Sequence, residues 1–176
     1  MSEAPKFDPD QSWAPLEARI ATEENPRRRQ LLEKVRDHMR TEISGDLEGL
    51  MDTLADEPRY HFWGTPVEGG PKGRAAVEAF YRQMIEGGGH RFHFDIKRIV
   101  VDDDTVVTEG QIHQQVPGEA LVASGVEEVG GEPVDGDANY LSETHIVTVW
   151  PMTSSGQIIG EDIYFGSPPM ERLRRL

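Results

Sequence analysis

The sequence predicts an α+β domain in which a curved sheet, mixed or antiparallel, wraps around three N-terminal helices and encloses a conical cavity. Two observations carry this prediction. Apolar residues recur three times at helical spacing before residue 90, and from there on they alternate with a period of two. Helices followed by a run of strands are typical of domains in which the helices cover one face of a sheet. The 176 residues, 36% of them apolar, suffice for one such domain.

The three predicted helices precede most of the sheet. The first, at 25–44, begins with an Asn-Pro pair that supplies a cap and a first-turn proline. Asp46 can cap a second, shorter helix, which we expect Pro58 to stop. The third follows a Gly/Pro-rich loop at 64–73 and ends at the three glycines 87–89.

The strands are indicated by alternation and by turn residues. The sequence RYHFW at 59–63 is a short strand between the second and third helices. An antiparallel hairpin is expected over 90–113, with its turn at the three aspartates 102–104. Two further strands, 141–150 and 157–165, are joined by a Thr-Ser-Ser-Gly turn.

The flanking and connecting segments are polar. Residues 1–24 form an arm that we expect to be disordered or a short packed turn, so the main domain covers 25–166. The acidic, glycine-rich segment 115–140 is expected to be a long connection that acts as a lid or variable loop. The basic tail, 167–176, is expected to be solvated, and the alternative is that its arginines lie against an acidic neighbour.

The composition excludes several classes of protein. With 32 acidic and 18 basic residues the net charge is −14, which disfavours nucleic acid and membrane surfaces as partners. The chain contains no cysteine, which excludes disulfides, thiolate nucleophiles and thiolate zinc sites. It lacks a basic start followed by an apolar run, and no segment approaches the roughly 20 apolar residues of a membrane span. We therefore expect a soluble, cytoplasmic protein.

Short motifs in a fixed order connect the chain to a known family. They are SGDLEGL at 44–50, LADE at 54–57, KGRAAVEAFY at 72–81, SGQI at 155–158 and EDIYF at 161–165. Together they resemble the SnoaL-like branch of the nuclear transport factor 2-like superfamily. The resemblance implies a cystatin-like α+β barrel related to ketosteroid isomerases and polyketide cyclases. That fold hosts isomerases, epoxide hydrolases, dehydratases, polyketide cyclases and non-catalytic binding or assembly modules.

Two mechanisms of the superfamily lack their residues in this chain. At the position that the resemblance assigns to the general-base aspartate of ketosteroid isomerases, this sequence has Phe62. Their oxyanion-hole tyrosine corresponds to His38, and their second oxyanion donor falls near Val147. The Arg-x-Asp motif of limonene epoxide hydrolases is replaced by Gly-Gln-Ile at 110–112. Both mechanisms are therefore disfavoured.

Two adjacent carboxylates mark the last strand. Strand alternation lets only one of Glu161 and Asp162 face the cavity, and Glu161 shares its face with the apolar Ile163 and Phe165. The resemblance also places Glu161 on the cavity face, and on the preceding strand it assigns His145 to that face. We therefore expect His145 and Glu161 to form an acid–base pair across the two strands.

Other side chains are expected to complete the cavity. His38 lies beside the apolar stripe of the first helix, and Tyr60 is expected to point inward from RYHFW, so either could stabilise an oxyanion. The alternative for each polar candidate is a structural hydrogen bond, and for each aromatic residue a place in the core. The expected ligand-binding residues are Phe62, Trp63, Tyr81, Glu143, Val147, Ile163 and Phe165.

No metal or cofactor is expected. His90 and His93 would point to opposite faces of a strand. The segment 135–139 begins like a calcium loop, but Tyr140 occupies its glycine position and Ile146 its bidentate acid position.

We therefore expect a homodimer, formed through the outer sheet face, that binds a small and largely apolar organic molecule. If it is an enzyme, it is a cofactor-free isomerase, cyclase or lyase that works by acid–base catalysis. The alternative is a non-catalytic ligand-binding or assembly module whose polar cavity groups are structural.

Overall fold

The computed structural model describes residues 7–65, 68–167 and 171–176. Its helices are η1 (Pro9–Gln11), α1 (Ala14–Thr22), α2 (Pro26–Ser44), α3 (Leu47–Asp52), α4 (Arg74–Glu86) and α5 (Gly118–Ala123). Its strands are β1 (Leu54–Trp63), β2 (Phe92–Val101), β3 (Thr105–Pro117), β4 (Glu128–Val129), β5 (Glu132–Pro133), β6 (Asn139–Pro151), β7 (Ile158–Phe165) and β8 (Leu173–Arg175).

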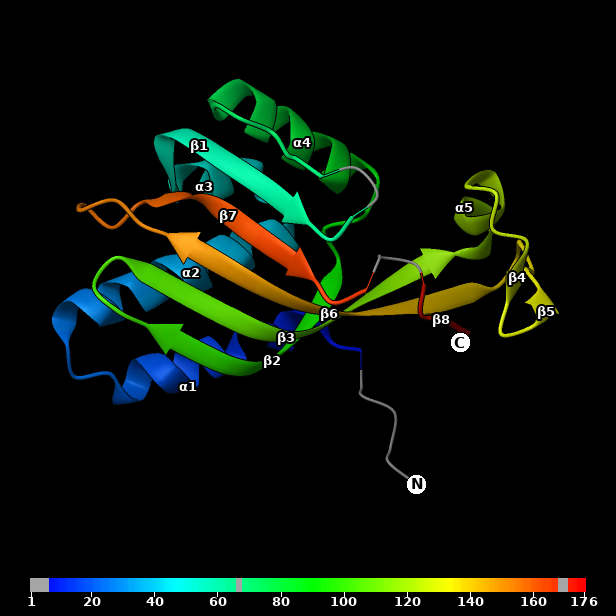
Figure 1. Cartoon of the computed structure of the whole chain (residues 1–176), viewed down its shortest axis with the longest axis horizontal. Coiled ribbons are helices and arrows are strands. Elements are labelled where there is room, and N and C mark those ends of the chain that lie inside the picture. The colour runs from blue at the N-terminus through cyan, green and yellow to red at the C-terminus, as the bar shows by residue number, and fades with distance from the viewer. Residues whose placement is uncertain (1–6, 66–67, 168–170) are drawn as a thin grey trace.

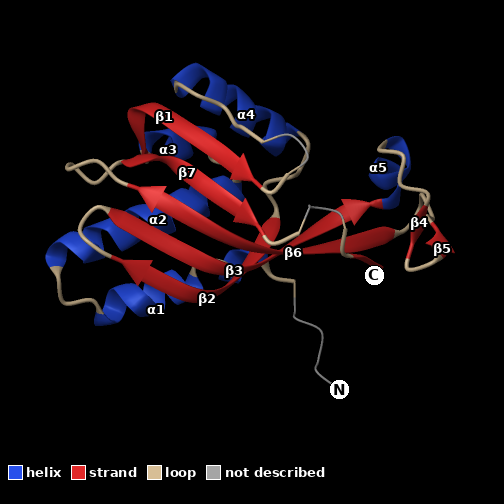
Figure 2. Ribbon diagram, viewed as in Figure 1, coloured by secondary structure: helices blue, strands red, loops and turns tan. Residues whose placement is uncertain are grey.

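A six-stranded sheet packs against a layer of helices, which is the predicted α+β plan. The strand order is β1-β7-β6-β3-β2, and β8 adds to the far end of β6. In Figures 1 and 2 the helices α1, α2 and α3 lie behind the sheet, and α4 lies beside β1. The pair β1 and β7 is parallel, whereas the other pairs of this sheet are antiparallel. The parallel pair sets Tyr60 opposite Glu161.

Helix α2 runs along the concave side of the sheet and brings polar groups into the core. The Asn25 side chain caps it by accepting hydrogen bonds from the backbone N–H groups of Arg27 (2.9 Å) and Arg28 (3.2 Å). Gly45 ends it in a left-handed conformation with φ of 75°. Its buried stripe contains a histidine and a glutamate among apolar residues: Leu31, Leu32, Val35, His38, Met39, Glu42 and Ile43.

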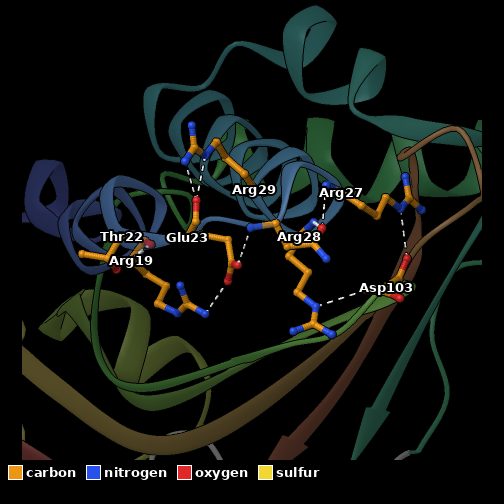
Figure 3. Close-up of polar contacts among 8 residues, drawn as sticks. Arg19, Thr22, Glu23, Arg27, Arg28, Arg29 and Asp103 are labelled. Atoms are coloured by element: carbon orange, nitrogen blue, oxygen red, sulfur yellow. Dashed lines mark hydrogen bonds and ion pairs between the residues drawn. The ribbon is translucent and has the colours of Figure 1, made fainter.

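The N-terminal arm is better ordered than the sequence suggested. Residues 14–22 form helix α1, whose Leu16 is fully buried in the core, so the expectation of a disordered arm or short turn is wrong there. Glu23 joins α1 to α2, because its carboxylate binds Arg19 and accepts the backbone N–H of Asn25 (3.0 Å; Figure 3). The Arg29 guanidinium donates to the Glu23 carbonyl.

The start of α2 is also tied to the turn between β2 and β3. Arg27 Nε donates to the carbonyl of Asp103 at 3.0 Å, and Arg28 Nε lies 3.1 Å from the Asp103 carboxylate (Figure 3). The turn at 102–104 is thus the predicted hairpin turn, and it also contacts the helix layer.

The second predicted helix is shorter than expected. It ends at Asp52, and β1 begins at Leu54, so Pro58 lies inside a strand instead of stopping a helix. Proline is tolerated here because β1 is at the edge of the sheet, and the register of β1 on β7 is irregular between Leu54 and Arg59.

The acidic segment at 115–140 is an arm and not a lid. Strands β3 and β6 remain paired as far as Pro117 and Asn139, and α5 with the β4–β5 hairpin lies at the distal end (Figure 1). No described residue from 115 to 140 lines the cavity described below. The described part of the tail, 171–176, is mostly exposed, but it is held in place because β8 pairs with β6 and Arg175 lies against the acidic Asp135.

None of the described helices combines the length and apolar character that a membrane span requires.

Candidate active site

A cavity of about 270 Å³ lies between the concave face of the sheet and the helices α2 and α4. Its wall is largely aromatic and includes Phe62, Phe80, Phe92, Phe94, Trp150 and Phe165. Such a concave, apolar space with a few polar groups is typical of small-molecule sites.

Glu161 enters this cavity from β7, and its neighbour Asp162 does not. The Glu161 side chain is buried, and the residue is only 6% exposed. Asp162 points to the outer face, where it lies 3.1 Å from Arg59 Nη1. The close approach of β7 to β1 depends on Gly160, since a Cβ there would overlap the Arg59 carbonyl and its φ of 153° disfavours other residues. Strand alternation therefore leaves Glu161 as the inward carboxylate.

Glu161 belongs to a buried hydrogen-bond network centred on Tyr81. The Tyr81 hydroxyl lies 3.1 Å from Glu161 Oε1, 2.9 Å from the Tyr60 hydroxyl and 3.1 Å from His38 Nε2. His38 Nε2 is also 3.4 Å from Glu161 Oε1. Tyr60, Tyr81, His38 and Glu161 come from β1, α4, α2 and β7, so only the tertiary fold brings them together.

The hydrogen bonds of Thr53 define the tautomer of His38. The Thr53 hydroxyl donates its single hydrogen to the Leu50 carbonyl at 2.6 Å. It must then accept from His38 Nδ1, which lies 2.7 Å away. His38 therefore carries a hydrogen on Nδ1 and directs Nε2 to Tyr81 and Glu161, where it can accept or hold a proton.

Both tyrosines of the network are held as neutral donors. Burial, followed by the negative charge of Glu161, raises the pKa of the Tyr60 and Tyr81 hydroxyls well above the usual value. Both phenols line the cavity, and Tyr60, which accepts from Tyr81, keeps a hydrogen that it can donate to a ligand oxygen.

Glu42 is a second cavity carboxyl, which the sequence analysis missed. It is 9% exposed, and among the described residues none donates a hydrogen bond to its carboxyl. Burial, followed by the negative charge of Glu161, raises the pKa of Glu42 well above its usual value. Helical periodicity could have found it, because Glu42 follows Val35 by seven positions and Met39 by three.

The expected pair of His145 with Glu161 is wrong. The His145 side chain lies on the outer face, 44% exposed, with Nε2 3.3 Å from Glu109 Oε1. Glu143 and Val147 share that outer face, so neither lines the cavity. A slip of one residue inverts a strand, and the inward residues of β6 are instead Ser142, Thr144, Ile146, Thr148 and Trp150.

The other predicted ligand-binding residues divide between the two faces. Phe62, Tyr81, Ile163 and Phe165 line the cavity. Trp63 does not, because it stacks between His61 and Tyr164, with ring centroids 3.9 Å and 5.8 Å away. Tyr60 and His38 are in the network, although His38 is completely buried behind the cavity wall.

Hydroxyl groups line one side of the cavity along β6. Ser142, Thr144 and Thr148 are buried, and within the described residues their hydroxyls have no hydrogen-bond partner. They can therefore donate to, or accept from, a ligand.

The described residues contain no group of three or more His, Asp or Glu side chains that could hold a metal ion. Asp135, the first residue of the calcium-like segment, is engaged by Arg175 and by the backbone N–H of Asp137.

Solved structures of other proteins have the same fold at low sequence identity. A Shewanella putrefaciens protein described as a SnoaL-like polyketide cyclase is 15% identical, with a TM-score of 0.60 over 94% of this chain and 92% of its own. The epoxide hydrolase/cyclase-like enzyme SalBIII, described in pyran ring formation in the polyether salinomycin, is 11% identical, with a TM-score of 0.55 over 83% of this chain and 95% of its own. A computationally designed 17-OHP binder is 17% identical, with a TM-score of 0.56 over 84% of this chain and 96% of its own.

A search of the curated proteins finds none that matches this sequence. The family model of the SnoaL-like domain matches residues 35–150, which is more than half of the chain. The matched region runs from α2 to β6 and includes most elements of the cavity wall. The chain therefore belongs to the SnoaL-like domain family.

Proposed function

We propose that the protein is a cofactor-independent acid–base enzyme, an isomerase, cyclase or lyase, which acts on a small and largely apolar organic molecule in the cavity. The observation that carries the proposal is the Glu161 carboxylate, which faces an apolar cavity while Tyr81 and His38 contact it from behind. A carboxylate that is held in place and faces an apolar cavity can take a proton from a substrate bound there.

In this proposal Glu161 accepts a proton from a C–H or O–H group of the substrate. The Tyr60 hydroxyl, which accepts from Tyr81 and keeps its own hydrogen, donates a hydrogen bond to the oxygen on which negative charge develops. His38 does not line the cavity, so it acts through Glu161 as a positioning residue that can hold the transferred proton on Nε2. Isomerisation, cyclisation and elimination share this first proton transfer.

The proton transfer can be tested without knowing the natural substrate. We would incubate the protein in D₂O with one- and two-ring ketones, 2-tetralone among them, and follow deuterium entry beside the carbonyl by NMR. We expect exchange above the buffer rate, and a loss of about 10²-fold or more in Glu161→Gln.

Asp162→Asn is the matched control, because it removes the adjacent carboxylate from the outer face. We expect it to exchange at the wild-type rate. The enzyme proposal would be contradicted if deuterium exchange were no faster with the protein than in buffer alone. It would also be contradicted if Glu161→Gln exchanged at the wild-type rate.

The second candidate is a non-catalytic binding module, and one observation favours it. Both ring nitrogens of His38 already have protein partners, so the network can be structural. In that case ligands would bind in the cavity while no variant would change the exchange rate.

A further inference from the structure

The cavity wall carries two carboxyl groups and, among its described residues, no cationic side chain. Glu42 and Glu161 both line it, whereas no Lys or Arg is found among the described lining residues. His38 contacts Glu161 from a fully buried position behind the wall. An anionic ligand would therefore meet repulsion without compensation.

Glu42 differs from Glu161 because the protein provides it with no partner. Glu161 has the Tyr81 hydroxyl and His38, but among the described residues none donates a hydrogen bond to Glu42. A buried carboxyl group without a partner destabilises a fold, and this one occupies a position of the apolar stripe of α2. The group that could satisfy it is one that enters the cavity.

The walls around these carboxyls suit an organic cation. Aromatic side chains, among them Tyr60, Tyr81 and Trp150, line the cavity. A cation near aromatic rings is attracted by their π electrons, most strongly where water is excluded. The net charge of −14 also raises the local concentration of cations around the protein.

We propose that the ligand of this cavity carries a protonated amine on an apolar skeleton, and that Glu42 is the carboxylate that binds the ammonium group. The inference rests on the proposed use of the cavity as a small-molecule site. Glu161 and the tyrosines then act on another part of the same ligand. Specificity for amines comes from Glu42, and the proton transfer comes from Glu161.

The proposal makes ligand binding dependent on pH in a defined direction. Without a ligand, Glu42 retains its proton to a higher pH than an exposed glutamate, because of burial and the charge of Glu161. An ammonium group favours the ionised carboxylate, so binding releases this proton to the solvent. Affinity therefore rises with pH until the amine itself loses its proton.

Three probes of similar shape test the charge preference: 2-naphthylmethylammonium, 2-naphthalenemethanol and 2-naphthoate. We would measure their binding at pH 7 by calorimetry, in two buffers of different ionisation enthalpy to count released protons. We expect the ammonium probe to bind about tenfold or more tightly than the alcohol, and the carboxylate to bind most weakly. Proton release should accompany only the ammonium probe.

Glu42→Gln keeps the shape of the side chain and removes its charge. We expect this substitution to lower the affinity for the ammonium probe about tenfold or more and to change the affinity for the alcohol by no more than about twofold. It should also abolish the proton release. The control variant is Glu48→Gln on α3, which removes an exposed charge nearby and should change neither affinity.

The outcomes separate the two proposals. The amine proposal is overturned if the ammonium and alcohol probes bind with equal affinity, or if Glu42→Gln lowers the affinity for both probes equally. The cavity would then remain a binding site. No binding of any probe at millimolar concentration contradicts both. If the ammonium probe binds tightly but the protein catalyses no deuterium exchange, the amine proposal is supported and only the enzyme proposal is contradicted.

Discussion

Three pairs of histidine and glutamate lie at most 3.4 Å apart among the described residues, and in two of them, one on each face of the sheet, the histidine uses its Nε2 atom. On the inner face His38 Nε2 is 3.4 Å from Glu161, and on the outer face His145 Nε2 is 3.3 Å from Glu109. The inner histidine is completely buried, whereas 44% of the outer histidine side chain is exposed to solvent. Coulombic interactions are stronger where water is excluded, so the same distance has different energetic consequences.

The inner face also perturbs the groups around its pair. The charge of Glu161 contributes to raising the pKa of Glu42, Tyr60 and Tyr81. The comparison teaches that burial and neighbouring groups, more than the residue types of a pair, make a site chemically distinct.

The largest expected effect is a loss of stability that differs between the inner and outer faces of the sheet. Val106 and Val107 are adjacent in β3, with Val106 fully buried in the core and Val107 half-buried on the outer face. We expect Val106→Asn to lower the free energy of unfolding by about 3 kcal/mol, because a buried amide lacks partners, and Val107→Asn by about 1 kcal/mol. Urea unfolding measures both. Equal losses would mean that the two faces are equally buried.

An intermediate effect is expected at Glu42. Its folded-state pKa is raised, so its favourable contribution is complete below the unfolded-state pKa near 4.5 and is lost as pH rises through the folded-state value. We expect Glu42→Gln to become more stable relative to wild type over that range, by at most about 1.4 kcal/mol per pH unit. Urea unfolding from pH 4 to 9 measures the difference, with Glu48→Gln as control. If the free energy of unfolding changed with pH in the same way for wild type and Glu42→Gln, this prediction would be wrong.

The smallest effect is expected for the ion pair between Arg59 and Asp162 on the outer face. Arg59 and Asp162 have side chains that are 49% and 20% exposed, so solvent and salt screen their attraction. A double-mutant cycle with Arg59→Ala and Asp162→Asn should give a coupling of at most about 1 kcal/mol, which decreases further as salt is added. A larger coupling would show that the outer face is less hydrated than its exposure indicates.

Much of the fold could be predicted from local sequence patterns. The caps at Asn25 and Asp46, the glycines after α4 and the aspartate turn at 102–104 act within a few residues of their position. Helix α1 was missed because its N-cap is Trp13, which makes no side-chain cap hydrogen bond, and because its apolar stripe is short. Strand β8 was missed because its three residues become a strand only by pairing with β6.

The candidate site could be predicted only in part. Ile163 and Phe165 identified Glu161 as the inward carboxylate, because the face of a strand that carries apolar residues usually faces the core. In β6 the same reasoning fails, since both faces carry apolar residues: Ile146 and Trp150 inward, Val147 and Val149 outward. The resemblance selected the outward set, and His145 was therefore placed on the wrong face.

Local sequence patterns were enough for the order of the helices α2–α4 and of the main strands, for their caps and turns, and for the separation of Glu161 from Asp162 onto opposite faces. These features depend on neighbours along the chain and on the periods of the two regular structures. The meeting of His38 with Glu161, and the place of Glu42 in the same cavity, depend instead on how distant segments pack together. Contacts between residues far apart in sequence fix the register of β6 against β3 and β7. Such contacts also fix the position of α2 on the sheet.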